Sequence, residues 1–298
     1  MQNVKVTRKG KRGPVPARLF FILARKAPVA ILFRRGPSDW VQIVRWCADT
    51  DIFEPGQWFH GRIYERRADL TPDGSLLVYF ASKINKKSLR DEEYTYAWTA
   101  ESKPPFLTAL ALWPKGDCWH GGGMFRDNCT LVLNHRANAS AQHPAHRPEP
   151  LRVILKNNVC GEDDPIYSER LERDAWELKQ CWEIENRGYP QMFRTLRPEI
   201  REKEARTGRH LIRLTRSITR LDYSEEFEFV DQDRGSTTTL QNAGWADWDQ
   251  RGRLVFVCGG RVMAGSFEQG GTLVFNQLAD LNSASPAPLP APEWAANW

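Results

Sequence analysis

Two distant stretches of the chain share one pattern. Residues 68–80 read ADLTPDGSLLVYF and residues 246–258 read ADWDQRGRLVFVC, aligned without a gap. Each has an Ala-Asp pair, a polar turn that ends in glycine and a Leu-rich run, and GMFRDNCTLVLN at 123–134 keeps the polar turn and the apolar run. A turn glycine tolerates positive φ and lets two antiparallel strands reverse tightly. The pattern predicts a chain that repeats one β unit.

The rest of the chain also favours strands. Roughly fifteen short apolar runs are separated by turn residues, which is typical of an all-β protein. Helical periodicity is seen convincingly only in RPEIREKEARTG at 197–208, where charges recur four apart between a proline and a glycine. We therefore predict an all-β fold with one short, solvated helical insertion at this place.

A recurring unit of several short strands is the sequence signature of a β-propeller blade, and about four strands per blade predict five blades. The segment GWADWDQRGRLVFVCGGRVMAGSF at 244–267, with its Trp-Asp dipeptide and Gly-Gly turn, resembles half a blade of WD40-like and TolB-like propellers. The segment 103–125, KPPFLTALALWPKGDCWHGGGMF, resembles uncharacterised bacterial propeller-like proteins. The resemblance implies a rigid disc whose loops and rims bind partners.

Charge and composition predict three regions. Residues 1–18 hold six cations and no acid, within a chain of net charge +5, and are expected to form a disordered basic arm. Residues 19–282 are expected to form one propeller-like domain with loop insertions near 135–150 and 186–209. Residues 283–298 form a Pro-rich tail, in which Trp294 and Trp298 would either fill a groove on a partner or fold back onto the domain.

A polyanion or an acidic protein partner would bind the arm, through Lys5, Arg8, Lys9, Lys11 and Arg12. The stretch 194–220 adds nine Arg and Lys residues against three glutamates, so nucleic-acid binding is one hypothesis. Without residues 1–18 the chain is close to neutral, which is unlike a basic nucleic-acid platform.

Metal binding is considered because cysteines and histidines gather between residues 118 and 146. They are Cys118, His120, Cys129, His135, His143 and His146. Zinc sites usually present their ligands in tight pairs such as CxxC or HxxxH, and only Cys-x-His and His-x-x-His occur here. We expect no metal and no other cofactor, and keep Cys118, His120, His143 and His146 as the weaker metal-site hypothesis.

Acids offer a catalytic hypothesis. Asp69 and Asp247 recur in the repeat, with Asp249 beside them. Glycoside hydrolases, which include five-bladed propellers, use carboxyl groups around a pocket as nucleophile and acid. Acids next to turns more often accept hydrogen bonds from nearby backbone amides, so turn capping is the favoured interpretation. The glycines of GDCWHGGGMF are likewise expected to form a tight turn rather than a phosphate-binding loop.

The leading functional hypothesis is a non-catalytic protein-interaction module, or a scaffold subunit of a bacterial regulatory or defence system. The alternatives are a hydrolase that acts on a glycan or phosphate ester through acids in the central funnel, and a nucleic-acid-binding accessory protein. No apolar run of membrane-spanning length and no secretory signal is seen, so a cytoplasmic location is expected. Scattered cysteines (Cys47, Cys118, Cys129, Cys160, Cys181 and Cys258) predict buried thiols rather than disulfides.

Overall fold

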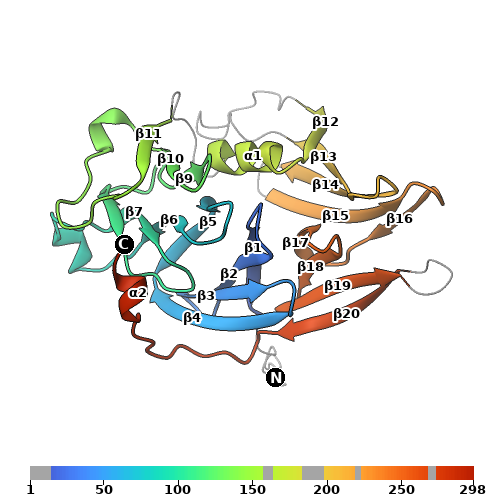
Figure 1. The fold of residues 1–298 in the computed structure, drawn as a ribbon, viewed down its shortest axis with the longest axis horizontal. Coiled ribbons are helices and arrows are strands. Elements are labelled where there is room, and N and C mark those ends of the chain that lie inside the picture. Colours follow the sequence, from blue (N-terminus) through green and yellow to red (C-terminus); the bar gives the residue numbers. More distant parts are fainter. Residues whose placement is uncertain (1–14, 157–163, 183–197, 219–222, 268–272) are drawn as a thin grey trace, which may run out of the picture.

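The computed structural model describes residues 15–156, 164–182, 198–218, 223–267 and 273–298. Within these ranges the chain is mostly β, with five sheets of three to five strands (Figure 1). The helices are α1 (Asp164–Arg173), α2 (Glu293–Ala296) and two short 3-10 turns, at Ser88–Arg90 and Ala137–Ala139. The prediction of an all-β fold is thereby confirmed at the level of fold class.

The sheets follow one another along the chain. Sheet 1 contains β1 (Arg18–Leu23), β2 (Val29–Arg35), β3 (Trp40–Cys47) and β4 (Ile52–His60). Sheet 2 contains β5 (Arg62–Leu70), β6 (Leu77–Ser82), β7 (Ala97–Ser102) and β8 (Ala111–Pro114). Sheet 3 contains β9 (Gly123–Phe125), β10 (Thr130–Leu133) and β11 (Arg152–Leu155), and β11 runs parallel to β10.

The last two sheets are antiparallel throughout. Sheet 4 contains β12 (Glu177–Cys181), β13 (Glu199–Glu204), β14 (His210–Ile218), β15 (Tyr223–Asp231) and β16 (Ser236–Thr239). Sheet 5 contains β17 (Ala243–Trp248), β18 (Leu254–Cys258), β19 (Arg261–Phe267) and β20 (Leu273–Asp280). In each of these sheets the spatial order of the strands is their order in the sequence, so every strand pairs with its neighbour in the chain.

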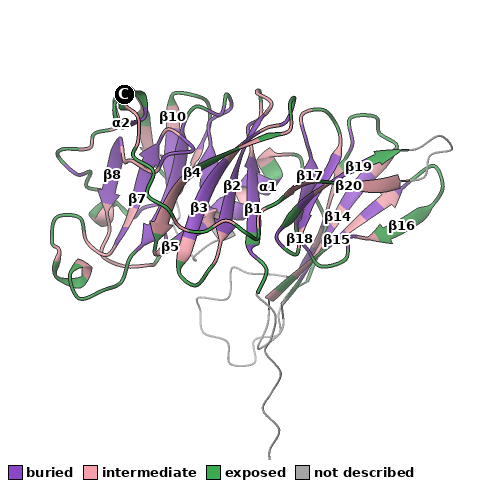
Figure 2. Ribbon diagram, turned by 90° about the horizontal axis from the view of Figure 1, so that it is seen from below, coloured by how far each residue is buried: buried purple, intermediate pink, exposed green. Residues whose placement is uncertain are grey.

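The five sheets stand around a common centre (Figure 1). The first strands of sheets 1, 2 and 3 lie next to one another there, and β17 of sheet 5 contacts β1 on one side and β15 of sheet 4 on the other. Phe21 of β1 contacts the ring of Trp46 within sheet 1 and the ring of Trp245 in sheet 5, which joins the two sheets. Buried residues are common on the inner strands, whereas β16 is mostly exposed and β20 has no buried residue (Figure 2).

The sequence repeat corresponds to a structural repeat. Its copies form the turns between the first and second strands of sheets 2, 3 and 5. In sheet 2 the Thr71 N–H donates to the Leu76 carbonyl at 2.9 Å, and in sheet 5 the Asp249 N–H donates to the Arg253 carbonyl at 2.9 Å. Gly74 and Gly252 both have φ of +78°, the left-handed conformation that these turns require.

The predicted helix at 197–208 is wrong. Glu199–Glu204 is strand β13, followed by a turn at Gly208. The charges alternate with period two, so Glu199 and Arg201 share a buried face where Arg201 Nε lies 2.7 Å from Glu199 Oε1. Charges four apart fit a helix and a strand equally well, and tertiary ion pairs decide between the two.

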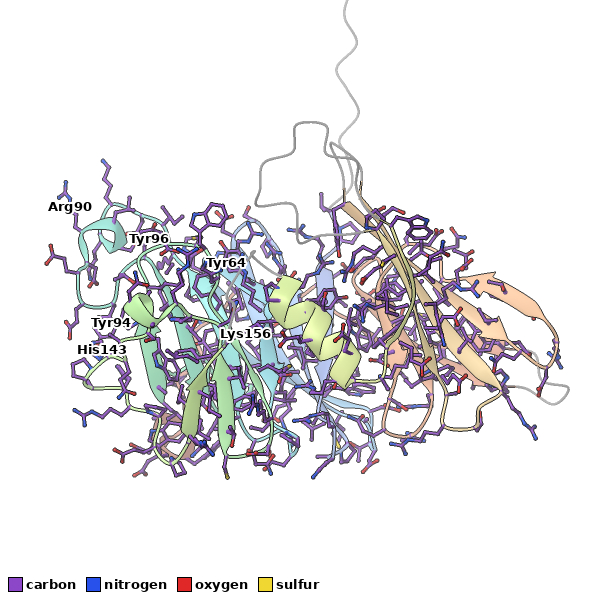
Figure 3. The ribbon with its side chains drawn as sticks, turned by 90° about the horizontal axis from the view of Figure 1, so that it is seen from above. Tyr64, Arg90, Tyr94, Tyr96, His143 and Lys156 are labelled. Carbon is purple, nitrogen blue, oxygen red and sulfur yellow. The ribbon has the colours of Figure 1, made fainter. Side chains whose placement is uncertain are left out.

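Helix α1 was not predicted, because an Asp-Pro pair such as Asp164-Pro165 is typical of a turn or loop. Proline in the first turn is well tolerated, since its missing N–H has no partner there in any case. The helix buries Ile166, Tyr167 and Leu171 and lies between sheets 2 and 3 on one side and sheet 4 on the other (Figures 1 and 3). Sheets 3 and 4 therefore contact each other through α1.

The C-terminal tail folds back onto the sheets. Gln57 Nε2 donates to the Leu289 carbonyl at 2.9 Å, and Lys103 Nζ donates to the Asn297 carbonyl at 2.6 Å. The Trp294 ring packs edge-on against Phe106 with ring centroids 5.4 Å apart, and Trp298 Nε1 donates to the Arg147 carbonyl. Of the two predicted arrangements for the tail, the structure shows the one that docks on the protein itself.

The cysteines are free in the described ranges, but they are less buried than predicted. Cys129 and Cys181 are exposed, because one lies in the turn between β9 and β10 and the other on the edge strand β12. Cys47, Cys118 and Cys258 are partly buried. In the described part of the chain no helix has the length and hydrophobicity needed to span a membrane.

Candidate functional site

A cavity of about 400 Å³ opens where the first strands of sheets 1 and 5 end. Its walls come from β1, from the end of α1 and the residues after it, from β13 and its turn, and from β17. The aromatic lining residues are Phe21, Tyr167, Trp176, Phe227, Trp245 and Trp248. The charged lining residues are Arg25, Arg170, Arg173, Asp174, Lys203, Glu204, Arg206, Asp247 and Asp249. The cavity is thus central, partly aromatic and rich in charge.

Asp247 lies in the wall of this cavity. Its Oδ1 is 2.6 Å from Lys203 Nζ and accepts the Trp248 backbone N–H at 2.7 Å, and its Oδ2 accepts a longer bond from Trp176 Nε1. Burial raises the pKa of Asp247, and the Lys203 ammonium opposes this effect. The negative charge of Asp174, a second carboxylate of the cavity, adds to the raised pKa. Two carboxyl groups and one ammonium therefore meet in one cavity.

Asp69 is the equivalent repeat residue in sheet 2, but both of its carboxylate oxygens already have hydrogen-bond partners within the protein. Arg173 holds it with two bonds, at 2.5 Å and 3.0 Å, and the Phe125 N–H donates to its Oδ2 at 2.8 Å. No part of the Asp69 side chain is exposed. Burial lowers the pKa of Arg173, but the carboxylates of Asp69 and Asp174 together outweigh burial and raise it. Asp69 thus ties α1 to sheets 2 and 3, and its oxygens face the protein.

Asp249 serves the turn between β17 and β18. Its Oδ1 accepts the backbone N–H groups of Arg251 and Arg253, and its Oδ2 pairs with Arg253 Nε at 2.7 Å. Arg253 in turn binds Asp51 of sheet 1 with two bonds and lowers the pKa of that carboxyl. The carboxylate of Asp249 therefore caps a turn and joins sheet 5 to sheet 1, as the capping interpretation describes.

The six cysteines and histidines between residues 118 and 146 do not form one cluster. His143 Nε2 bonds to Glu93 at 3.1 Å, while its ring stacks on Tyr94 at the outer edge of the molecule, away from α1 (Figure 3). His135 is buried inside, bonded to Thr99 and to the Ala139 carbonyl, and burial lowers its pKa to about 4. Among the described residues there is no group of three or more side chains that could hold a metal ion.

His146 lies beside His143 and Tyr94, whereas the other two candidate metal ligands, Cys118 and His120, lie close to Arg67. Its NH1 donates to the backbone carbonyls of Cys118 and His120, and the guanidinium stacks on Tyr64 and Phe80. His120 has φ of +58° and is buried. The glycines that follow do form the predicted tight turn, with Gly121 and Gly122 at positive φ. This segment thereby packs β5 and β6 of sheet 2 against β9 of sheet 3.

The predicted polyanion-binding residues of the arm, Lys5, Arg8, Lys9, Lys11 and Arg12, lie outside the described residues. Trp294 and Trp298 belong to the docked tail, although 56% and 41% of their surfaces remain exposed. Sequence reasoning missed Arg25, Arg173, Trp176 and Lys203, which share no motif and meet only through the packing of three sheets and α1. Period-two alternation in β13 is the one signal that could have pointed Lys203 toward the interior.

No protein-family model and no curated protein matches the chain. A solved structure described as a candidate 6-phosphogluconolactonase from Bacteroides fragilis is 10% identical, with a TM-score of 0.29, and the alignment covers 90% of this chain and 95% of that one. The hydrazine synthase of Kuenenia stuttgartiensis is 11% identical, with a TM-score of 0.21, over 94% of this chain and 71% of that one. Both TM-scores are too low for inferring a shared activity.

Proposed function

We propose that the protein binds a small polar ligand in the central cavity. The strongest support is the composition of the cavity wall, which contains both tryptophan rings and the Lys203–Asp247 ion pair. A volume of about 400 Å³ lies within the range of small-molecule sites, and such sites combine apolar walls with a few placed polar groups. Flat aromatic rings bind the carbon skeleton, while the ion pair orients the polar groups of the ligand.

The proposal includes a five-bladed, propeller-like arrangement. Five sheets around one centre support it, as does the repeat, whose copies occupy the first hairpin of sheets 2, 3 and 5. In such an arrangement each first strand lines the axis, and the central cavity is the natural binding place. Helix α1 substitutes for part of the contact between sheets 3 and 4, which distinguishes this protein from a regular WD40-like or TolB-like propeller.

Calorimetry on paired variants tests ligand binding. The double variant Lys203→Met, Asp247→Asn removes the two charges while keeping similar volume, and should weaken any cavity ligand by at least tenfold, about 1.4 kcal/mol. The matched control is Lys179→Met, Glu177→Gln, an exposed ion pair on β12. Equal affinity of wild type, double variant and control for every ligand found would place binding elsewhere and refute the proposal.

Hydrolysis of a glycan or phosphate ester in the same cavity is a second candidate function. It is favoured by Asp247, a buried carboxyl of raised pKa whose neighbour Asp174 is a second carboxyl group. When their environments give two carboxyl groups different pKa values, one can donate a proton while the other stays ionised. Asp247→Asn should abolish hydrolysis and leave the melting temperature within a few degrees, whereas unchanged turnover would exclude this role.

The interaction-module hypothesis remains a further proposal, including its setting in a bacterial multiprotein system and in the cytoplasm. One observation favours it: all five residues of β12, an edge strand of sheet 4, are exposed, and Leu178 is 48% exposed. Exposed edges can accept a strand from another chain. Replacing Leu178 with Lys should then disrupt a partner complex.

The nucleic-acid hypothesis predicts salt-sensitive binding that is lost when residues 1–18 are deleted.

A further inference from the structure

The positive charges of the cavity outnumber their partners. Arg173 is paired with Asp69 and Asp174, Lys203 with Asp247, and Asp249 with Arg253. These pairs account for three of the four acids in the wall. The remaining acid, Glu204, forms no ion pair among the described residues, and neither do three cations of the wall: Arg25, Arg170 and Arg206. The wall thus holds five cations and four acids, and Asp69 behind it pairs with Arg173.

Arg25 is the most constrained of the three. Its NH2 donates to the carbonyls of Phe125 and Arg126, at 3.0 Å and 3.1 Å, and its buried Nε has no hydrogen-bond partner in the described part of the chain. Arg173 NH1 donates to the same Phe125 carbonyl at 3.3 Å, so two guanidinium groups lie against one oxygen. Burial and the charge of Arg173 lower the pKa of Arg25, and the carboxylates of Asp69, Asp174 and Asp127 offset this effect only in part.

Arg206 and Arg170 complete the positive end. Arg206 follows β13 and is exposed, so it lies where the cavity opens to solvent. Arg170 is buried and donates to the Ala68 carbonyl, and its ring neighbours are Phe20 and Tyr167. Arg170 therefore adds positive charge to the cavity wall, but we do not expect it to donate a hydrogen bond to a ligand. A planar guanidinium with unused N–H groups matches the geometry of carboxylate and phosphate oxygens.

We infer that the ligand of the central cavity is a small organic anion, whose phosphate or carboxylate group binds Arg25 and Arg206. This inference rests on the proposed binding function and specifies the class of its ligand. The apolar or ring part of the anion contacts Trp176 and Trp248, and the Lys203–Asp247 pair lies beside it. The anion supplies a direct ion pair for Arg25, which the carboxylates of Asp69, Asp174 and Asp127 influence without forming a salt bridge to it.

Inorganic phosphate and acetate are the probes, because they represent the two possible anionic groups. Their binding to full-length protein can be followed by ³¹P and ¹³C NMR line broadening at constant ionic strength. We expect saturable binding of at least one probe in the millimolar range, corresponding to about −4 kcal/mol. Arg25→Gln and Arg206→Gln should each weaken it at least fivefold. The preference between the two probes identifies the anionic group.

Arg136→Gln is the matched control, since Arg136 is exposed in a loop and lies outside the cavity wall. Among the described residues the Arg206 side chain forms no hydrogen bond or ion pair, so its variant keeps the test valid if Arg25→Gln fails to fold. Absence of saturable binding, or equal loss in all three variants, overturns the inference. If neutral polyols shift the cavity tryptophans in the same samples while neither anion binds, the proposed function stands and only the anionic class fails.

Discussion

Glu101 on β7 provides a quantitative test of how sheets 2 and 3 pack. The side chain has no exposed surface, and neither of its oxygens has a hydrogen-bond partner within the described residues. Its strand neighbours Val78 and Ala111 belong to an apolar cluster with Leu131 and Leu133 of sheet 3. Burial in these surroundings raises the pKa of Glu101 from 4.5 to about 8.

The raised pKa makes stability fall with increasing pH. Between pH 4.5 and about 8 the folded protein keeps a proton on Glu101 that the unfolded chain has lost, so the free energy of unfolding decreases through this window. A shift of this size corresponds to about 5 kcal/mol once the pH exceeds the folded pKa. Glu101→Gln, which stays neutral, should therefore match wild type near pH 4.5 and be more stable by several kcal/mol at pH 9.

Urea unfolding of both proteins at pH 5, 7 and 9 measures this difference. Taking the difference between variant and wild type cancels the opposite contribution of His135, whose lowered pKa makes stability rise between about pH 4 and 6.5. Glu92→Gln, an exposed loop change, serves as the control and should leave the pH dependence unchanged. A constant stability difference between Glu101→Gln and wild type across the three pH values would refute the buried, unpaired state of Glu101.

Three further predictions concern the closure of the fold. Deleting residues 283–298 removes the contacts of the tail with sheets 1 and 2 and should lower the melting temperature by several degrees in calorimetry; no change would contradict the observed docking. Arg253→Met leaves the buried Asp249 without its cation and should lower the free energy of unfolding in urea by about 3 kcal/mol. The loss should be smaller when Asp51, the second partner of Arg253, is also replaced by Asn. Gly122→Ala would place a methyl group 1.9 Å from the Arg67 carbonyl at a φ of +76°, so we expect little folded protein in expression and circular dichroism tests.

The fold class could be predicted from the sequence because its signals are local. The polar turn followed by a Leu-rich run is typical of a hairpin, and it correctly indicated the first hairpins of sheets 2, 3 and 5. Segment 199–204 was misassigned because its side chains are charged on both faces, and only the distant Arg216 reveals that Glu199 is buried. A local pattern cannot contain this information.

The candidate site was only partly predictable. Asp247 was singled out from the repeat, yet the equivalent Asp69 takes a different role because Arg173 of α1 neutralises it. Arg25, Trp176 and Lys203 come from three separate parts of the chain and meet through long-range packing. Their chemistry becomes visible only when sheets 1, 4 and 5 are placed around the cavity, since no spacing rule connects them.

Ligand binding in the central cavity can be tested most directly by ¹⁵N–¹H NMR of the tryptophan indole groups. Trp176 and Trp248 both line the cavity, and their Nε1–H groups donate to Asp247 and to the Lys203 carbonyl respectively. We predict that a library of small organic anions contains compounds that shift these two indole signals saturably, while those of the exposed Trp119 and Trp294 stay in place. Saturable shifts confined to Trp119 and Trp294, or none at the cavity signals, would contradict a central binding site.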